Sequence, residues 1–197
     1  SYDILTNLKL KYVTPIRMVD FEASNAKILE AKGNRNFLEY MWTLSSVFTD
    51  YVLNTFKNVE YVAYLDADLY FYDSPKIIFD EMGDNSVLII PHNLPPWKKE
   101  KEETVGKYNV GMIIFKNDEN GRECLSWWKD ECLKWCYEKT DEPGKFGDQK
   151  YIDYFEEKFK KIYVCRHKGS GLAGWNIQNF KEKIHAVNDH IMIDEEP

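Results

Sequence analysis

Two carboxylates, Asp66 and Asp68, stand one residue apart directly after the apolar run Tyr61–Leu65. A short apolar run bounded by turn-forming residues is typical of a buried strand in an α/β sheet. Open α/β sheets bind ligands at the carboxyl ends of their strands, where both acids are expected to lie. Two carboxylates this close repel each other unless a cation or a proton intervenes. A hard divalent ion that keeps free positions for phosphate oxygens is the simplest partner for the pair.

Three further polar clusters fall at predicted strand ends or loops. Asn109 and Gly111 lie in the apolar run 108–115, Asp148 and Gln149 close the turn 146–149, and a glycine-rich loop spans 169–174. A glycine such as Gly111 allows a bulky ligand to approach the backbone closely. Each cluster alone has a plainer interpretation, because Asp148 could be only a helix N-cap and Asn109 could satisfy a buried backbone group.

Length and composition favour a single globular domain of 197 residues with a sizeable core. The net charge of −7 argues against a general nucleic-acid-binding role, which requires a basic surface. The longest apolar runs are too short to span a bilayer, so no transmembrane segment is expected. An acidic protein that binds a phosphate must therefore do so through a local device such as a metal ion.

The four cysteines fit neither a zinc site of paired Cys-x-x-Cys motifs nor a dense disulfide framework. We expect buried, reduced thiols that pack as small hydrophobic side chains. That chemistry suits a reducing cytoplasm, and we predict a cytoplasmic location, with peripheral association at the inner membrane face as an option.

Periodicity predicts strands alternating with helices, and therefore an α/β fold with a mixed, mostly parallel sheet flanked by helices. We expect the tail of a helix in 1–10 and a polar connection with some helical character over 20–32. The long segment 92–107 has the length of a functional or mobile loop. The predicted strands span 12–19, 61–66, 86–91, 108–115, 161–164 and 184–187, and the predicted helices span 36–53, 76–82, 119–139 and 149–155.

Taken together, the four clusters resemble the nucleotide-sugar glycosyltransferases of the A-type fold. The chain is most similar to the family that includes the retaining bacterial galactosyltransferases and the glycogenins. The resemblance covers residues 12 to about 176, and the motifs Asp66-Ala67-Asp68, Asn109-Val110-Gly111 and Asp148-Gln149 come in the family's order. Val110 departs from the family pattern, which has alanine there.

The resemblance implies a metal-dependent hexosyltransferase with a nucleotide-sugar donor, most plausibly UDP-linked, and a glycan or glycolipid acceptor. It implies that the metal, Mn²⁺ or Mg²⁺, is bound by two carboxylates and that retention at the anomeric carbon is favoured. The metal ligands are then Asp66 and Asp68, the further donor-binding residues are Asn109 and Gly111, and the catalytic residues are Asp148 and Gln149. The acceptor side falls on Gly174, Trp175 and Asn176.

Two family features have no counterpart in the sequence. The nucleotide-binding first strand and helix are absent before Ser1, and His167, His185 and His190 do not match the context of the family's third metal ligand. We therefore expect a single glycosyltransferase-like domain over 1–197 that lacks its N-terminal nucleotide-binding unit and its C-terminal strand. The alternatives are a sugar-nucleotide or glycan-binding module without turnover and, third, a phosphatase of the haloacid dehalogenase type.

Overall fold

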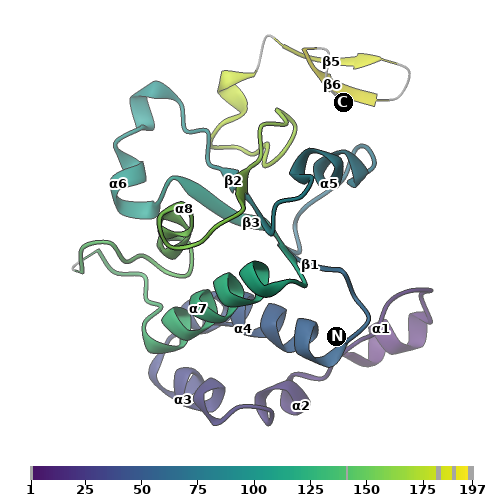
Figure 1. The fold of residues 1–197 in the computed structure, drawn as a ribbon, viewed down its shortest axis with the longest axis vertical. Helices are drawn as coiled ribbons and strands as arrows, with labels where there is room; N and C mark the ends of the chain where they lie inside the picture. Colours follow the sequence, from purple (N-terminus) through teal and green to yellow (C-terminus); the bar gives the residue numbers. More distant parts are fainter. Residues whose placement is uncertain (1, 141, 181–182, 188–189, 195–197) are drawn as a thin grey trace.

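The computed structural model describes residues 2–140, 142–180, 183–187 and 190–194 (Figure 1). In this part of the chain, four strands form one sheet in the order β1-β3-β2-β4, and two further strands form a separate hairpin. The strands are β1 (Tyr61–Leu65), β2 (Val87–Pro91), β3 (Tyr108–Lys116), β4 (Ile162–Val164), β5 (Ile184–Val187) and β6 (His190–Ile193).

The helices lie mainly before the sheet and between its strands. The α-helices are α1 (Tyr2–Leu8), α2 (Met18–Glu22), α3 (Ala26–Asn34), α4 (Phe37–Thr55), α5 (Lys76–Met82), α6 (Lys101–Val105), α7 (Glu119–Lys134) and α8 (Phe155–Lys158). Short 3₁₀-helices are η1 (Pro96–Lys98), η2 (Lys150–Tyr154) and η3 (Ile177–Asn179). The mixed α/β architecture with a mixed sheet is as predicted.

The prediction of a mostly parallel sheet is wrong for the described strands. β3 pairs antiparallel with both β1 and β2, and only the β2–β4 pair is parallel. The alternation of strands and helices does not reveal this, because the segment 92–107 contains η1 and α6 and still returns the chain antiparallel to β2. β3 consequently lies between β1 and β2, and its residues face both neighbours.

A bulge interrupts the pairing of β3 with β2. Leu88 pairs with Ile114, whereas Ile90 pairs with Asn109, so residues 110–113 of β3 oppose the single residue Ile89. On its other side β3 stays in register with β1, and the ladder continues where the Asp66 N–H donates to the Gly111 carbonyl at 2.9 Å. Bulges bend a strand and redirect its side chains, which is why they are frequent beside active sites.

Apolar side chains cover both faces of the sheet. Along β2, Val87 and Ile89 pack into the layer formed with α4 and α7, while Leu88 and Ile90 pack with α5 on the opposite face. This alternation is the period of two expected of a strand buried on both sides. Figure 1 shows α2 and α3 beside α4, where they build a further apolar cluster. Helix α4 starts with a capping box in which Asn36 and Glu39 satisfy each other's backbone N–H groups.

The predicted strand over 12–19 is not formed. Residues 13–17 are irregular and α2 begins at Met18, so the second half of the run is helical. Pro15 cannot donate to a ladder, and no described strand lies alongside to pair with this stretch. The predicted polar connection over 20–32 is largely α-helical, since Asn25 caps α3 by accepting from the Lys27 N–H at 3.0 Å.

The ends of two later elements also differ from the prediction. Helix α7 stops at Lys134 rather than at residue 139, because Trp135 takes an extended conformation. The predicted helix 149–155 is the 3₁₀-helix η2 leading into α8. All four cysteines are free and buried, as expected. None of the helices in the described ranges is both long and apolar enough to cross a membrane.

Candidate functional site

The bulge in β3 brings Asn109, Gly111 and Asp66 together. The side chain of Asn109 turns back on its own strand, and its Oδ1 accepts from the Gly111 N–H at 2.7 Å. A Cβ at Gly111 would lie 2.6 Å from Asn109 Oδ1 and 3.8 Å from Asp66 Oδ2. Position 111 therefore has no room for a side chain unless Asn109 moves. The close approach of a ligand to Gly111 stays a prediction, and the groups that lie close to Gly111 in the structure are the side chains of Asn109 and Asp66.

A pocket of 130 Å³ opens at this point, and we call it the polar pocket. It is lined by side chains from helix α4, the end of β1, β3 and the turn before η2. The lining residues are Trp42, Tyr64, Asp66, Asn109, Val110 and 146–149. Four of the residues predicted to form the site therefore line the same pocket, although they come from distant parts of the sequence. They are Asp66, Asn109, Asp148 and Gln149.

Asp148 is the most deeply buried polar group of this pocket, with 5% of its surface exposed. Its carboxylate Oδ2 lies 2.6 Å from the hydroxyl of Ser45 on α4, and its backbone carbonyl accepts from the Trp128 indole N–H at 2.8 Å. These contacts fix both the backbone and the side chain of Asp148 between α4 and α7. The residue is held from two helices, so its role is not that of a simple helix cap.

Burial raises the pKa of Asp148 to about 7, and the nearby charge of Asp66 acts in the same direction, whereas the hydrogen bond from Ser45 lowers it. The geometry around Ser45 agrees with this direction. The Ser45 hydroxyl is 2.6 Å from both Asp148 Oδ2 and the Trp42 carbonyl, yet it carries one proton to donate. A protonated Asp148 satisfies all three groups, because it donates to Ser45, which then donates to Trp42.

Asp66 is held by the preceding strand. The hydroxyl of Tyr64 donates to Asp66 Oδ1 at 2.6 Å, and Tyr64 packs edge-on against Trp128 at 6.5 Å between ring centroids. Burial raises the pKa of Tyr64 well above its usual range, and the hydrogen bond to Asp66 adds to the effect. Tyr64 therefore stays a hydrogen-bond donor, which leaves Asp66 Oδ2 as the atom on the Gly111 side.

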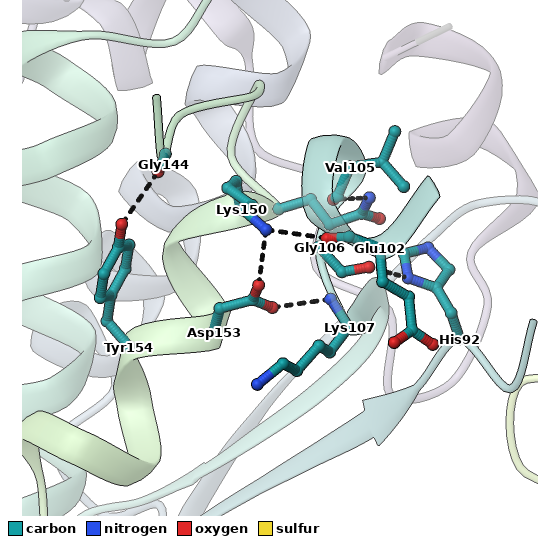
Figure 2. A network of polar contacts seen from close by, with 10 residues as sticks. His92, Glu102, Val105, Gly106, Lys107, Gly144, Lys150, Asp153 and Tyr154 are labelled. Carbon is teal, nitrogen blue, oxygen red and sulfur yellow. Dashed lines mark hydrogen bonds and ion pairs between the residues drawn. The ribbon is translucent and has the colours of Figure 1, made fainter. Parts of the chain in front are cut away.

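Gln149 connects the pocket to helix α6. Its Nε2 donates to the Val105 carbonyl at 2.7 Å, and its Oε1 lies 3.4 Å from Asn109 Nδ2. Figure 2 shows the neighbouring network, in which Lys150 donates to the Glu102 carbonyl at 2.8 Å and pairs with Asp153 at 2.9 Å. The segment predicted to be a loop is thus folded and anchored to η2 beside the pocket.

His92 supports the same segment from the end of β2. Its Nδ1 lies 2.9 Å from the Gly106 carbonyl, which can only accept, so Nδ1 carries the proton (Figure 2). Burial lowers the pKa of His92, and the Gly106 carbonyl partly offsets this. A neutral imidazole at this position fixes the turn through Gly106 and thereby the carbonyl of Val105 that Gln149 binds.

A second, larger pocket of 310 Å³ adjoins the first at Asn109, and we call it the apolar pocket. Residues 68–75 and 169–172 form much of its wall, together with Ile191 and Ile193 of the hairpin. Its rim carries exposed aromatic side chains, with Tyr70 77% exposed and Tyr72 65% exposed. Asp68 and Gly111 line this pocket, so Asp66 and Asp68 belong to two adjacent pockets.

The carboxylates of Asp66 and Asp68 are of the ligand type that hard divalent ions prefer. Ions of this kind are commonly held by one or two carboxylates, with the remaining positions taken by substrate phosphates and water. Asp66 and Asp68 can provide those two, and no group of three metal-binding side chains converges anywhere in the described ranges. His167 lines the apolar pocket with a buried Nε2 that has no hydrogen-bond partner among described residues, and His185 is exposed on β5. The side chain of His190 lies outside the described part.

The three residues predicted for the acceptor side line neither pocket. Asn176 is buried, and its side chain donates to the carbonyls of His92 and Gly171 at 3.0 Å. Trp175 is 39% exposed and meets the His92 ring edge-on at 6.2 Å. Nothing lies within 4 Å of a Cβ built on Gly174. Asn176 thus fixes the loop against the end of β2, and Gly171 of the same loop reaches the apolar pocket.

Three side chains of the site were not anticipated from the sequence. Trp42 and Ser45 come from α4, and Tyr64 comes from within β1. The periodicity of apolar residues in α4 predicted the helix but did not single out Trp42 or Ser45. A usable signal was the series of hydroxyl residues within that apolar helix, Thr43, Ser45, Ser46 and Thr49, all of which are buried.

Comparisons with known proteins identify two curated relatives, both from Bacillus subtilis (strain 168). The chain is 37% identical over 182 residues to the uncharacterized protein YfnF, covering 89% of this chain and 59% of YfnF. It is 31% identical over 198 residues to the uncharacterized protein YfnD, covering 100% of this chain and 62% of YfnD. The chain therefore spans about six tenths of the length of these relatives. No protein-family model matches it, and no solved structure matches significantly.

Proposed function

We propose that this chain carries the donor site of a metal-dependent glycosyltransferase, which moves a sugar from a UDP-linked donor to a carbohydrate-type acceptor. The observation that supports it most is the polar pocket, where Asp66, Asn109, Asp148 and Gln149 converge from separate elements. These are the residues that the resemblance to A-type-fold glycosyltransferases assigns to donor binding and catalysis.

The chemistry of the polar pocket suits a sugar. Carboxylates accept hydrogen bonds from hydroxyl groups, and the amides of Asn109 and Gln149 both donate and accept. The two amides are 3.4 Å apart, a weak contact that a sugar hydroxyl can replace. Transfer also needs a second binding region next to the first, and the apolar pocket meets the polar pocket at Asn109.

Asp66 and Asp68 would hold the metal ion, which would supply Lewis-acid neutralisation of the charge that develops on a departing diphosphate. Asp148 and Gln149 would hold the sugar hydroxyls or stabilise positive charge near the anomeric carbon. With a pKa of about 7, Asp148 changes its charge within the physiological range. The resemblance favours retention of configuration in this transfer.

The direct test is a calorimetric titration of UDP into the protein with and without Mn²⁺. We expect binding that requires Mn²⁺ and that is lost in Asp68→Ala, because the variant removes one of two carboxylates for the ion. Asp130→Ala is the matched control, since Asp130 is an exposed carboxylate on α7 outside both pockets. UDP binding that is indifferent to Mn²⁺ would rule out the assignment of Asp66 and Asp68.

Two alternatives are separated by product analysis. Release of free UDP from a panel of UDP-sugars, with transfer to an added acceptor, identifies an enzyme. Binding of the same compounds without release identifies a binding module without turnover. Phosphate release from a phosphomonoester would point instead to a phosphatase.

A further inference from the structure

We infer that the apolar pocket binds the aliphatic chain of an amphiphile, whose hydroxyl-bearing head lies at Asn109, where the apolar pocket meets the polar pocket. The inference goes beyond the proposed function, because such a compound can bind whether or not a sugar is transferred. The proposed function would make the same compound an acceptor.

Aliphatic side chains from four elements form the floor of the apolar pocket. Ile78 of α5, Ile90 of β2, Met112 of β3 and Ile193 of β6 line the pocket and are buried. Three of these side chains belong to one apolar cluster, so the floor is continuous with the core. A sugar on this floor would lose the water around its hydroxyl groups and would find no hydrogen-bond partner in these side chains. A hydrocarbon chain is stabilised by the same burial.

The segment 68–75 supplies apolar surface that the fold leaves partly uncovered. Its residues 69–72 all line the pocket, and the two less exposed of them, Leu69 and Phe71, have 39% and 43% of their surface exposed. Ile77, in the first turn of α5, is also exposed and lines the same pocket. Exposed apolar surface gathered in a pocket is typical of a binding site, because a ligand can bury it.

A further wall of the pocket is a loop that is fixed against the floor. Gly171 has a φ of +66°, and a Cβ at this residue would lie 2.7 Å from Ile90 Cγ2, so the loop backbone packs directly on β2. The side chain of Asn176 donates to the Gly171 carbonyl at 3.0 Å and so fixes the loop, which also places Leu172 in the pocket wall. A preformed floor and wall reduce the entropy cost of binding a flexible chain.

The volume of the apolar pocket leaves room for an octyl chain. The pocket measures 310 Å³. One water-sized sphere needs about 10–15 Å³ of such a volume, so the pocket holds roughly 20 of them. The carbon atoms of an octyl chain, each somewhat larger than a water molecule, therefore fit.

Asn109 gives the ligand its orientation. Its side chain lines both pockets, and its Nδ2 lies 3.4 Å from Gln149 Oε1, which is a weak contact. A hydroxyl group on the head of the ligand can replace this contact and accept from Nδ2. The chain then extends from Asn109 over the aliphatic floor.

The test titrates methyl, butyl, hexyl and octyl β-glucosides into isotope-labelled protein, below their micelle concentrations, and follows the isoleucine methyl signals by NMR. We expect octyl glucoside to shift the signals of Ile78, Ile90 and Ile193. The signals of Ile28 and Ile152 should stay in place, because both residues are buried and line neither pocket. The affinity should rise roughly twofold to fourfold with each added methylene group.

Phe71→Ala should weaken the binding of octyl glucoside roughly 3- to 10-fold, because the ring no longer covers the chain. The variant should fold, since Phe71 is already exposed. Phe56→Ala is the matched control, because Phe56 is similarly exposed and lines neither pocket. Equal weakening of octyl glucoside binding in the two variants would overturn the location of the chain.

Two further results would overturn the inference. Affinities that stay the same from methyl to octyl glucoside would show that the protein does not bind the chain. Tighter binding of phenyl β-glucoside than of hexyl β-glucoside, whose apolar group has the same number of carbon atoms, would show that the pocket takes an aromatic ring. These titrations contain neither UDP nor Mn²⁺, so their failure and the failure of the proposed function are observed separately.

Discussion

The polar pocket and the apolar pocket share a wall at Asn109 but are built in different ways. The polar pocket gathers side chains from α4, β1, β3 and the turn before η2. Asp148 and Gln149 are fixed there by hydrogen bonds to α4 and α6. The apolar pocket takes eight of its lining positions from the consecutive residues 68–75, whose aromatic side chains are exposed. The first is preorganised by the core of the fold, whereas the second is a surface that a ligand can cover.

This contrast predicts that changes in the polar pocket alter stability and donor binding together. Changes at the rim of the apolar pocket should alter neither. The expected effects decrease in the order Asp148→Asn, Gly111→Ala and the double variant Tyr70→Ala, Tyr72→Ala.

The largest effect is expected from Asp148→Asn. The unfolded chain releases this proton near pH 4 and the folded chain retains it up to about pH 7, so wild-type stability falls over that interval. The variant avoids this cost, and its amide can donate to Ser45 as the protonated acid does. We expect the free energy of unfolding at pH 8 to rise by about 2–4 kcal/mol relative to wild type, with the gain shrinking as the pH falls towards 4.

Urea unfolding at pH 4.5 and pH 8 measures this difference, with Asp130→Asn as the exposed control. Equal destabilisation of Asp148→Asn at both pH values would show that Asp148 is ionised in the folded protein. The same variant should lose activity, because a neutral amide cannot supply the negative charge that stabilises positive charge near the anomeric carbon.

A smaller effect is expected from Gly111→Ala. The added methyl group would lie 2.6 Å from Asn109 Oδ1 and displace that side chain from its bond to the Gly111 N–H. Loss of one hydrogen bond of this kind costs about 1–2 kcal/mol of stability. Because the displaced Asn109 amide can no longer meet the donor sugar, we expect the affinity for the UDP-sugar to fall roughly tenfold. Gly174→Ala is the matched control because its methyl group meets nothing within 4 Å. Equal affinities of the two variants for the UDP-sugar would show that Asn109 does not contribute to donor binding.

The smallest effect on the fold is expected from the double variant Tyr70→Ala and Tyr72→Ala. The two rings contact each other at 4.9 Å and are otherwise largely exposed, so the free energy of unfolding should change by less than about 0.5 kcal/mol. Donor affinity should stay at the wild-type value, while the KM for an acceptor with an apolar group should rise several-fold. A large loss of donor affinity would show that residues 68–75 belong to the donor site.

The sequence predicted four residues that line one pocket, Asp66, Asn109, Asp148 and Gln149, but not the strand direction that brings them together. Asn109 lies near Asp66 because β3 runs antiparallel to β1, so that the start of β3 is beside the end of β1. The antiparallel course of β3 was not predicted, since helix and strand periodicity carries no information on strand direction. The bulge that seats Asn109 beside Gly111 depends on pairing with Ile89, which is likewise a tertiary property.

The helix α4 shows a second limit of the sequence. The periodicity of its apolar residues predicted the helix correctly but did not show which residues reach the pocket. Trp42 and Ser45 reach it because they contact the turn 146–149, and that contact is a tertiary property. Conversely, the loop with Asn176 was predicted on the acceptor side, and its buried amide proves to bind the loop's own carbonyl at Gly171 and that of His92. Polar residues in glycine-rich loops serve loop geometry as well as ligands, and only the structure separates the two.

One measurement tests the central claim that the two carboxylates and the polar pocket form a single nucleotide-sugar site. It follows the backbone amide and indole N–H signals of isotope-labelled protein by NMR while Mn²⁺ and UDP-hexose are added together in small amounts. The account predicts that paramagnetic broadening is strongest for Asp66, Asp68, Asn109 and Gly111, extends to the Trp42 indole, and needs the nucleotide sugar to develop fully. Broadening centred elsewhere, or identical broadening by Mn²⁺ alone, would contradict it.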